Sequence, residues 1–215
     1  MNGKKEHQIL KDAIFEVKRG DTLHVISENY YYKTEPYYTI LSHEMAGLRV
    51  APASASVLDA YVIPICLEKA ALAGIPVSEW GISHSFIPVP AVVYGLNYFA
   101  TSSEFFVVTD PDTGKEVVKH ITNKGKYPFC YQRLPEGASI ESVISVFGRT
   151  FEQDQAIEEY SGRIYEIFGI PLVNMVFIRS NGCFSLSSLT PTRYTRLSEG
   201  ERSLLQAYIK NQAFL

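Results

Sequence analysis

The sequence predicts an α+β fold in one domain, and three successive hydrophobic patterns predict the order of its elements. Apolar residues in the first third recur with the spacing of a helix that has one buried face. Runs of β-branched and aromatic residues occupy the middle, which favours antiparallel strands. In the last third, apolar residues again recur at helical spacing, both before and after a short pair of expected strands. We therefore expect a mixed sheet with an N-terminal β-loop-α-β unit, an antiparallel β region and a C-terminal helix-hairpin-helix.

The N-terminal unit is expected to begin with a strand at residues 22–26 and a polar, aromatic loop at 29–35. Pro36 suits the first turn of a helix, and Gly47 suits a left-handed helix end. The chain is then expected to return as a strand at 48–51. Because the loop leaves the carboxyl end of the first strand, where open α/β sheets usually bind ligands, it is a candidate site.

The next segment is expected to form a helix that starts near Ser56 and restarts at Pro64, because proline disrupts a helix interior. Three strands are expected after it, at residues 92–94, 105–108 and 117–118. Residues 110–114 read Asp-Pro-Asp-Thr-Gly, which is typical of a tight turn. The middle of the chain is therefore predicted to contain antiparallel strands joined by a hairpin turn.

The last third is expected to contain a long helix, a strand pair and a final helix. Apolar residues at helical spacing over residues 157–168 predict the long helix. Asn181 and Gly182 form a two-residue hairpin signal, with an apolar run on each side. Ser198, with Glu201 three residues later, forms a capping-box pattern that predicts the start of the final helix.

Composition and charge exclude several classes of function. The 215 residues carry a formal net charge of -3, which gives no overall attraction to phosphate backbones or anionic membranes. Charged residues interrupt the apolar ones near the N-terminus, and no stretch has the length of a membrane span. We therefore expect a cytoplasmic protein with no membrane partner. The three cysteines are far apart and form no C-x-x-C pattern, so we expect reduced thiols and no metal site.

Two segments carry motifs in a specific order. Residues 25–61 contain Y-Y-Y-K-T-E-P-Y-Y at the expected helix start and A-G-L-R-V-A-P at its end. Residues 146–207 contain F-G-R-T-F, R-I-Y-E-I-F-G-I-P-L, C-F-S-L-S-S-L and L-S-E-G-E-R-S-L-L. In these segments the sequence resembles the RimK-like ATP-grasp N-terminal domain, a family that usually precedes an ATP-grasp ligase in one longer chain.

The resemblance implies an α+β fold and a role beside a ligase. Residues 78–139 do not match the family and look like an inserted β region within a single domain of residues 1–215. An ATP-grasp ligase holds magnesium through acidic residues, typically a Glu-x-Asn near its end, whereas this chain has Ser188-Leu189-Thr190. The resemblance therefore implies a non-catalytic accessory or substrate-presenting domain, without a cofactor. Its partner is expected to be a separately encoded RimK-like ATP-grasp ligase that joins an amino acid to a peptide or small carboxylate.

The loop and helix after the first strand hold the main candidate ligand site. Tyrosine rings beside polar groups can bind a small molecule or a peptide at low entropic cost. The candidates are Asn29, Tyr30, Tyr32, Tyr37, His43 and Glu44. The alternative is that the tyrosines are partly core residues and that His43 and Glu44 are solvated. If the junction does bind a ligand, the chain is an independent small-molecule-binding protein or enzyme, which is the alternative function.

Basic and aromatic residues are interleaved in a second candidate patch, which consists of Lys119, His120, Lys124, Lys126 and Tyr127. Such a pattern can bind single-stranded nucleic acid or an acidic peptide. It is also typical of the solvated face of a hairpin, which we favour here. Nucleic acid is therefore disfavoured as a partner.

Two further expectations concern catalysis and assembly. Cys130 with His120 or His84, and Ser83 with His84, lie in no recognised catalytic motif, so no catalytic residue is assigned. Apolar residues crowd the middle of the chain and predict a homo-oligomer. These are Ile87, Val89, Val92, Val93, Phe99, Phe105 and Phe106.

Overall fold

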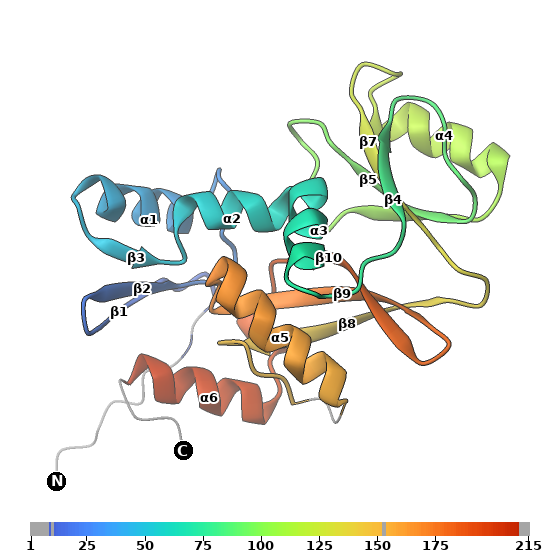
Figure 1. Ribbon diagram of the computed structural model, residues 1–215. Helices are drawn as coiled ribbons and strands as arrows, with labels where there is room; N and C mark the ends of the chain where they lie inside the picture. The colour runs from blue at the N-terminus through green and yellow to red at the C-terminus, as the bar shows by residue number, and fades with distance from the viewer. Residues whose placement is uncertain (1–8, 10, 152–153, 211–215) are drawn as a thin grey trace, which may run out of the picture.

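The computed structural model describes residues 9, 11–151 and 154–210, and this part of the chain has the α+β fold that the sequence predicts. Three small sheets and six α-helices form a larger and a smaller lobe (Figure 1). The smaller lobe contains the middle sheet, and the larger lobe contains the N-terminal and C-terminal sheets with most of the helices. None of the described helices has the length and hydropathy that a membrane crossing requires.

The N-terminal sheet has the strand order β1-β2-β3. Strand β1 (Phe15–Arg19) pairs antiparallel with β2 (Thr22–Ile26), and β3 (Arg49–Ala51) pairs parallel with β2. Helix α1 (Glu35–Met45) joins the two parallel strands, and Gly47 follows it at a φ of 80°. The predicted β-loop-α-β unit is confirmed, and β1 is an edge strand that the sequence pattern did not reveal.

Helices α2 (Ser54–Tyr61) and α3 (Ile63–Leu72) follow, and Pro64 lies in the first turn of α3, so the predicted restart is confirmed. Helix α2 begins slightly earlier than expected because Glu44 caps it. The Glu44 carboxylate accepts hydrogen bonds from the Ser54 backbone N–H at 2.9 Å and from the Ser54 hydroxyl at 2.5 Å. These bonds satisfy donors that a helix start otherwise leaves without a partner.

The middle sheet confirms the predicted antiparallel β region. Its strands are β4 (Trp80–Ser83), β5 (Ala91–Gly95), β6 (Phe105–Val108) and β7 (Phe129–Arg133). They lie in the order β4-β7-β5-β6, and every neighbouring pair is antiparallel. That this region is an insertion within a single domain stays a prediction.

The tight turn and the last strand predicted for the middle region are wrong, because that segment forms helix α4 (Pro111–Ile121). Asp110 is its N-cap, and the Asp110 carboxylate accepts hydrogen bonds from the N–H groups of Asp112 at 3.1 Å and Thr113 at 2.9 Å. Aspartate followed by proline at the first helical position starts helices as readily as it starts turns. The basic patch therefore begins on a helix and not on a hairpin.

The C-terminal sheet has the order β10-β9-β8. Strands β9 (Leu172–Ser180) and β10 (Cys183–Thr190) form the hairpin predicted around Asn181 and Gly182. Strand β8 (Ser139–Val146) pairs antiparallel with β9 and makes the predicted hairpin part of a three-stranded sheet.

Helices α5 (Gln155–Phe168) and α6 (Glu199–Ile209) complete the predicted helix-hairpin-helix. A short 3-10 turn, η1 (Tyr194–Arg196), leads into α6. The predicted capping box is confirmed: the Glu201 N–H donates to the Ser198 hydroxyl at 3.3 Å, and the Ser198 N–H donates to the Glu201 carboxylate at 2.7 Å.

The two lobes meet through a filled interior. Tyr94 of β5, Leu67 of α3 and Ile178 of β9 are buried in one hydrophobic cluster. The Tyr94 hydroxyl lies 2.7 Å from the Ser187 hydroxyl, and the Gln132 side-chain amide donates to the Ser187 carbonyl at 2.7 Å. Because all of these groups are buried, both packing and hydrogen bonds hold the middle sheet against the C-terminal sheet.

Most of the apolar residues that predict an oligomer are covered within the chain. Val92 and Val93 are fully buried, and Ile87, Val89, Phe105 and Phe106 pack against buried clusters. Phe99 is 77% exposed. The homo-oligomer stays a prediction, and of the seven apolar residues that suggested it, Phe99 is the one that remains strongly exposed.

Candidate functional site

A cleft of about 760 Å³ lies between the α2–α3 junction and the loop that joins β5 to β6, residues 96–104. Four tyrosines and several aliphatic side chains line it, and we call it the aromatic cleft. Its lining residues are Tyr31, Tyr32, Val57, Leu58, Tyr61, Val62, Ile63, Pro64, Ile65, Ile82, Gly95, Leu96, Asn97, Tyr98, Ala100, Thr101 and Ser102. Segments from four parts of the sequence, residues 31–32, 57–65, 82 and 95–102, therefore build one site.

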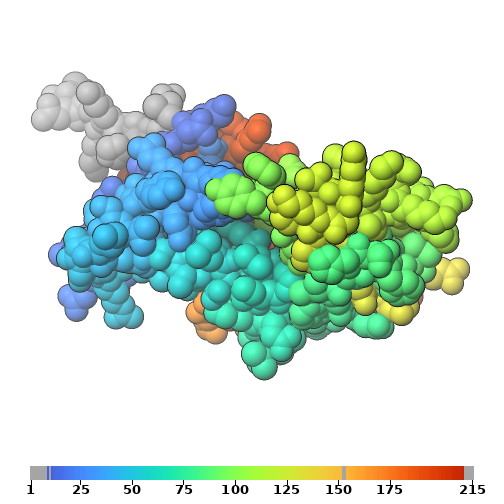
Figure 2. All heavy atoms as spheres, turned by 90° about the horizontal axis from the view of Figure 1, so that it is seen from above, coloured from blue at the N-terminus to red at the C-terminus, as the bar shows by residue number. Residues whose placement is uncertain are grey.

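The loop after β2 closes one edge of the aromatic cleft by contacts with the β5–β6 loop, which Figure 2 shows as green residues touching blue ones. The Tyr31 hydroxyl lies 2.7 Å from the Ser102 hydroxyl. The Tyr98 carbonyl accepts hydrogen bonds from the Tyr32 hydroxyl at 3.3 Å and from the Lys33 ammonium at 3.4 Å. The Lys33 ammonium also lies 3.6 Å from the Tyr98 ring centre, a cation–π contact.

Asn29 shapes this loop. Its side-chain carbonyl accepts a hydrogen bond from the Tyr31 N–H at 3.0 Å, which is typical of an Asx turn. The Thr34 hydroxyl donates to the Tyr31 carbonyl at 2.7 Å. Asn29 therefore positions Tyr31 and Tyr32 in the cleft wall and is not itself a lining residue.

Tyr30 lies in the core. Its hydroxyl accepts a hydrogen bond from the Ser27 N–H at 2.7 Å and donates to the Val25 carbonyl at 3.2 Å. Burial raises the pKa of Tyr30 well above its ordinary value. With both hydrogen bonds made inside the protein, Tyr30 anchors the loop and does not face a ligand.

The remaining candidates of the junction lie away from the aromatic cleft. Tyr37 packs against the main core and contacts the Tyr38 ring edge-on at 6.0 Å. The His43 imidazole lies 3.0 Å from the Glu16 carboxylate. Glu44 caps α2. Of the six residues predicted for this site, Tyr32 alone lines the cleft.

Sequence reasoning missed the opposite wall, which comes from α2, α3 and the β5–β6 loop. Leu58, Val62 and Ile65 line the cleft and are exposed to between 38% and 40%. The sequence analysis predicted a helix here, but it singled out none of these three residues, because apolar residues at helical spacing are as typical of a buried face as of a binding site. Tyr98, 63% exposed, faces them from the β5–β6 loop. A long-range contact of this kind leaves no local sequence signal.

Tyr61 at the end of α2 combines burial with an unused polar group. Its side chain is 8% exposed, and its hydroxyl has no hydrogen-bond partner in the described part of the chain. The ring of Tyr31 lies 4.7 Å away, centre to centre. Burial is the main cause that raises the pKa of Tyr61 well above its ordinary value, and the neighbouring Tyr31 adds to the effect.

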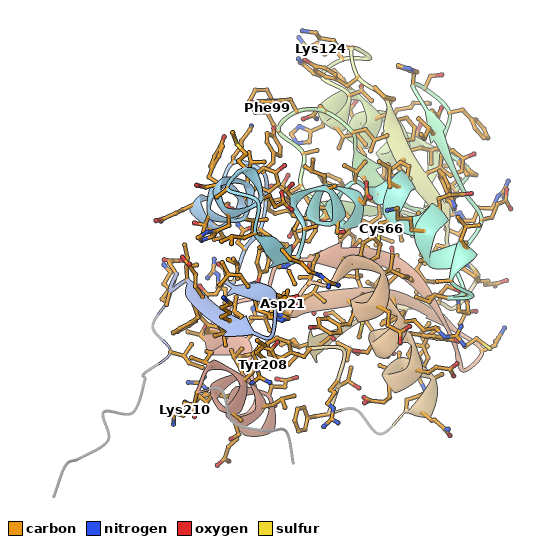
Figure 3. The ribbon with its side chains drawn as sticks, turned by 60° about the vertical axis from the view of Figure 1, so that its left-hand side comes forward. Asp21, Cys66, Phe99, Lys124, Tyr208 and Lys210 are labelled. Atoms are coloured by element: carbon orange, nitrogen blue, oxygen red, sulfur yellow. The ribbon has the colours of Figure 1, made fainter. Side chains whose placement is uncertain are left out.

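The structure divides the predicted basic patch. Lys119 and Lys124 line a shallow recess of about 360 Å³ with Lys115. His120 and Tyr127 line a different recess, of about 530 Å³. Figure 3 shows Lys124 at the far tip of the smaller lobe.

The Lys126 ammonium nitrogen lies 5.2 Å from the Tyr127 ring centre. The five predicted residues therefore do not converge on one pocket.

The candidate thiol is poorly suited to nucleophilic attack. Burial raises the pKa of Cys130 to about 12, and that of Cys66 to about 12 as well. A thiol must ionise to attack, so neither is reactive near neutral pH. The Ser83 hydroxyl accepts hydrogen bonds from the N–H groups of Ser85 and Phe86, as in an ordinary turn.

The segment that stands where an ATP-grasp ligase carries its acidic magnesium ligands does not fit that ion. Ser188 and Thr190 are buried on β10, and they offer hydroxyls where carboxylates are needed. Ser187 beside them is bonded to Tyr94 and Gln132. Among the described residues, no group of three or more His, Cys, Asp or Glu side chains is placed to hold a metal ion.

Comparison with known proteins identifies the fold. No protein-family model and no curated protein sequence matches this chain. Among solved structures, it is similar to the ATP-grasp ligase PsnB, complexed with a phosphomimetic variant of its minimal precursor, Mg and ADP. The TM-score is 0.57 at 16% identity, over 82% of this chain and 65% of that one. The chain thus spans about two thirds of PsnB.

Two further structures show the same likeness. A RimK domain protein ATP-grasp from Sphaerobacter thermophilus matches with a TM-score of 0.59 at 13% identity, over 82% of this chain and 77% of that one. D-Alanine-D-alanine ligase from Helicobacter pylori matches with a TM-score of 0.61 at 11% identity, over 80% of this chain and 65% of that one. The fold is therefore ATP-grasp-like.

This finding corrects the function expected from the sequence. The expected role was that of a non-catalytic accessory domain, on the basis of a domain that precedes the ligase. The chain instead matches ligase chains over about four fifths of its length, so its fold is ligase-like and the accessory role is wrong. The alternative, an independent small-molecule-binding protein or enzyme, agrees better with the structure.

Proposed function

We propose that this chain is an independent small-molecule-binding protein with an ATP-grasp-like fold, and that its ligand binds in the aromatic cleft. The observation that carries the proposal is the cleft itself. Its volume of about 760 Å³ lies in the range of small-molecule sites, and its walls are mostly apolar and aromatic with a few polar groups. The alternative function placed the site at the tyrosine-rich junction, and Tyr32 of that junction is part of this cleft.

Exposure of apolar side chains supports the proposal. Leu58, Val62, Ile65 and Ile82 are between 38% and 54% exposed, and all four line the same cleft. Clustered exposed apolar residues mark a surface that binds something, because leaving them in water is unfavourable. Folding leaves these side chains in contact with water. A ligand that covers them removes this apolar surface from water, and binding is stabilised by the hydrophobic effect.

Three predicted partners stay proposals. A separately encoded RimK-like ATP-grasp ligase and a peptide or small carboxylate are compatible with the fold. The third is a second copy of this chain, in a homo-oligomer.

The test uses a neutral fluorescent probe, N-phenyl-1-naphthylamine, titrated into the purified chain. We expect saturable binding that Ile65→Trp weakens by about tenfold or more, because the indole fills the cleft (an affinity loss of about 1.4 kcal/mol). Leu72→Trp is the matched control, since Leu72 is on the same helix, is 81% exposed and does not line the cleft. Equal affinities for both variants and the parent would refute the proposed site.

A further inference from the structure

We infer, on the basis of the proposed function, that the ligand of the aromatic cleft is an uncharged aromatic molecule, and that a magnesium nucleotide binds neither in this cleft nor between the middle and C-terminal sheets. The ligand class follows from charge and from ring geometry, and the exclusion of a nucleotide between the middle and C-terminal sheets follows from the filled contact between them. These three observations are independent of one another.

Charge is the first observation. None of the described residues that line the aromatic cleft has a side chain that is charged at neutral pH. Lys33 lies near the rim of the cleft, and its ammonium is already engaged. It lies over the Tyr98 ring and donates a hydrogen bond to the Tyr98 carbonyl. A phosphate or sulfonate buried in such a cleft loses its hydration without gaining a cationic partner, which is strongly unfavourable.

Ring geometry is the second observation. The Tyr31 and Tyr61 rings lie 4.7 Å apart at 45°, and the Tyr32 and Tyr98 rings lie 5.8 Å apart at 65°. Aromatic pairs at these separations offer ring faces and edges to a further aromatic ring. The Tyr61 hydroxyl has no partner in the described residues, so a ligand with a neutral acceptor that reached it would satisfy a buried donor.

Other polar groups of the cleft are already used. The Asn97 side-chain amide donates to the Ile121 carbonyl at 2.8 Å, and its carbonyl accepts from the Phe99 and Ala100 N–H groups at 2.8 and 2.9 Å. The Ser102 hydroxyl is hydrogen-bonded to the Tyr31 hydroxyl. Few polar groups remain for a highly polar ligand, which again favours an aromatic body with little polarity.

The filled contact between the middle sheet and the larger lobe's α3 and β9 is the third observation. Val92, Tyr94 and Cys130 of the middle sheet pack directly against Leu67 and Ile178 of the larger lobe. All five are at most 1% exposed. A nucleotide between these sheets would have to displace this packing and the buried hydrogen bonds to Ser187, so the lobes do not act as an open clamp.

The test compares two dyes that differ by one sulfonate: N-phenyl-1-naphthylamine, which is neutral, and 8-anilinonaphthalene-1-sulfonate. We expect the parent to bind the neutral dye at least about tenfold more tightly. Millimolar MgATP is expected neither to displace the neutral dye nor to raise the melting temperature. Leu58→Lys, which places a cation in the cleft wall, should shift the preference toward the sulfonate, whereas Leu72→Lys, outside the cleft, should not.

The outcomes separate the two proposals. If neutral-dye binding is absent or insensitive to Ile65→Trp, the proposed function fails and the inference fails with it. If binding is lost in Ile65→Trp but the sulfonate binds the parent as tightly as the neutral dye, the cleft stands and the uncharged ligand class is overturned. Saturable MgATP binding, or displacement of the dye by MgATP, overturns the exclusion of nucleotides.

Discussion

Tyr30 and Tyr61 are both buried tyrosines in the same core cluster, but their hydroxyls have opposite environments. The Tyr30 hydroxyl makes two hydrogen bonds to the backbone, and the Tyr61 hydroxyl makes none in the described part of the chain. A buried donor without a partner costs stability, whereas a bonded one is costly to remove. Tyr61 therefore combines a structural ring with a hydroxyl that is available to a ligand.

Tyr61→Phe is expected to raise the free energy of unfolding by about 1 kcal/mol, because it removes a buried hydroxyl that lacks a partner. Tyr30→Phe is the matched control, and it should lower that free energy by about 1–2 kcal/mol by leaving the Ser27 N–H and the Val25 carbonyl without their partner. Urea denaturation of both variants measures the difference. A loss of stability in Tyr61→Phe equal to that in Tyr30→Phe would contradict the assignment.

His24 on β2 gives the chain a pH dependence. Burial, and then the nearby Arg19, lower the pKa of His24 below its ordinary value of 6.5, and its Nδ1 has no partner in the described residues. The unfolded chain therefore binds the proton more tightly than the folded one. The free energy of unfolding should fall as the pH drops below about 6.5. His24→Gln should flatten this part of the profile in urea titrations, and parallel profiles for parent and variant would refute the account.

At the scale of elements, the sequence predicts best where one local signal has one meaning. The capping box at Ser198 and the hairpin at Asn181-Gly182 were predicted correctly for this reason. Helix α4 was not, because an Asp-Pro start is shared by turns and helices. Its Gly114 is also a poor helix former, yet an added Cβ there would lie 3.3 Å from a Val108 methyl, so the glycine lets α4 approach β6 closely.

The aromatic cleft could be predicted only in part. The loop after β2 was identified from its position at a strand end, and it supplies Tyr31 and Tyr32. The facing β5–β6 loop lies about sixty-five residues further on, as the contacts of Tyr32 and Lys33 with Tyr98 show. Such pairing depends on how the lobes pack, which no short window of sequence contains.

The contact between the two lobes gives a prediction at this scale. Tyr94→Phe removes the hydroxyl that bonds Ser187 and is expected to lower the free energy of unfolding by about 1–2 kcal/mol, because the buried Ser187 hydroxyl loses its partner. Tyr131→Phe on β7 is a control, since no hydrogen bond of its hydroxyl is found in the described chain. Equal urea midpoints for the two variants would show that this hydrogen bond does not hold the lobes together.

At the scale of the whole molecule, the chain combines a ligase-like fold with a closed interior between its lobes. The likeness to ATP-grasp ligases lies between 11% and 16% identity, so it defines the fold and leaves the chemistry to the residues present. Those residues place hydroxyls where an ATP-grasp ligase carries carboxylates, and they leave an apolar cleft beside the middle sheet.

The predicted homo-oligomer also belongs to this scale. Phe86 and Phe99 remain 65% and 77% exposed on the smaller lobe, so an assembly would bury them. Light scattering at micromolar concentration is expected to show a dimer or larger species, and Phe99→Ser should shift it toward the monomer. A parent that is monomeric under these conditions contradicts the prediction.

The most direct measurement of the central claim is a crystal structure of the chain grown with N-phenyl-1-naphthylamine. The account predicts density for the dye in the aromatic cleft, between the α2–α3 junction and the β5–β6 loop, with a ring against Tyr31, Tyr61 or Tyr98 and the Tyr94–Ser187 contact intact. Density for the dye between the middle and C-terminal sheets, with the Tyr94–Ser187 contact broken, or an empty aromatic cleft beside a dye bound elsewhere, would contradict it.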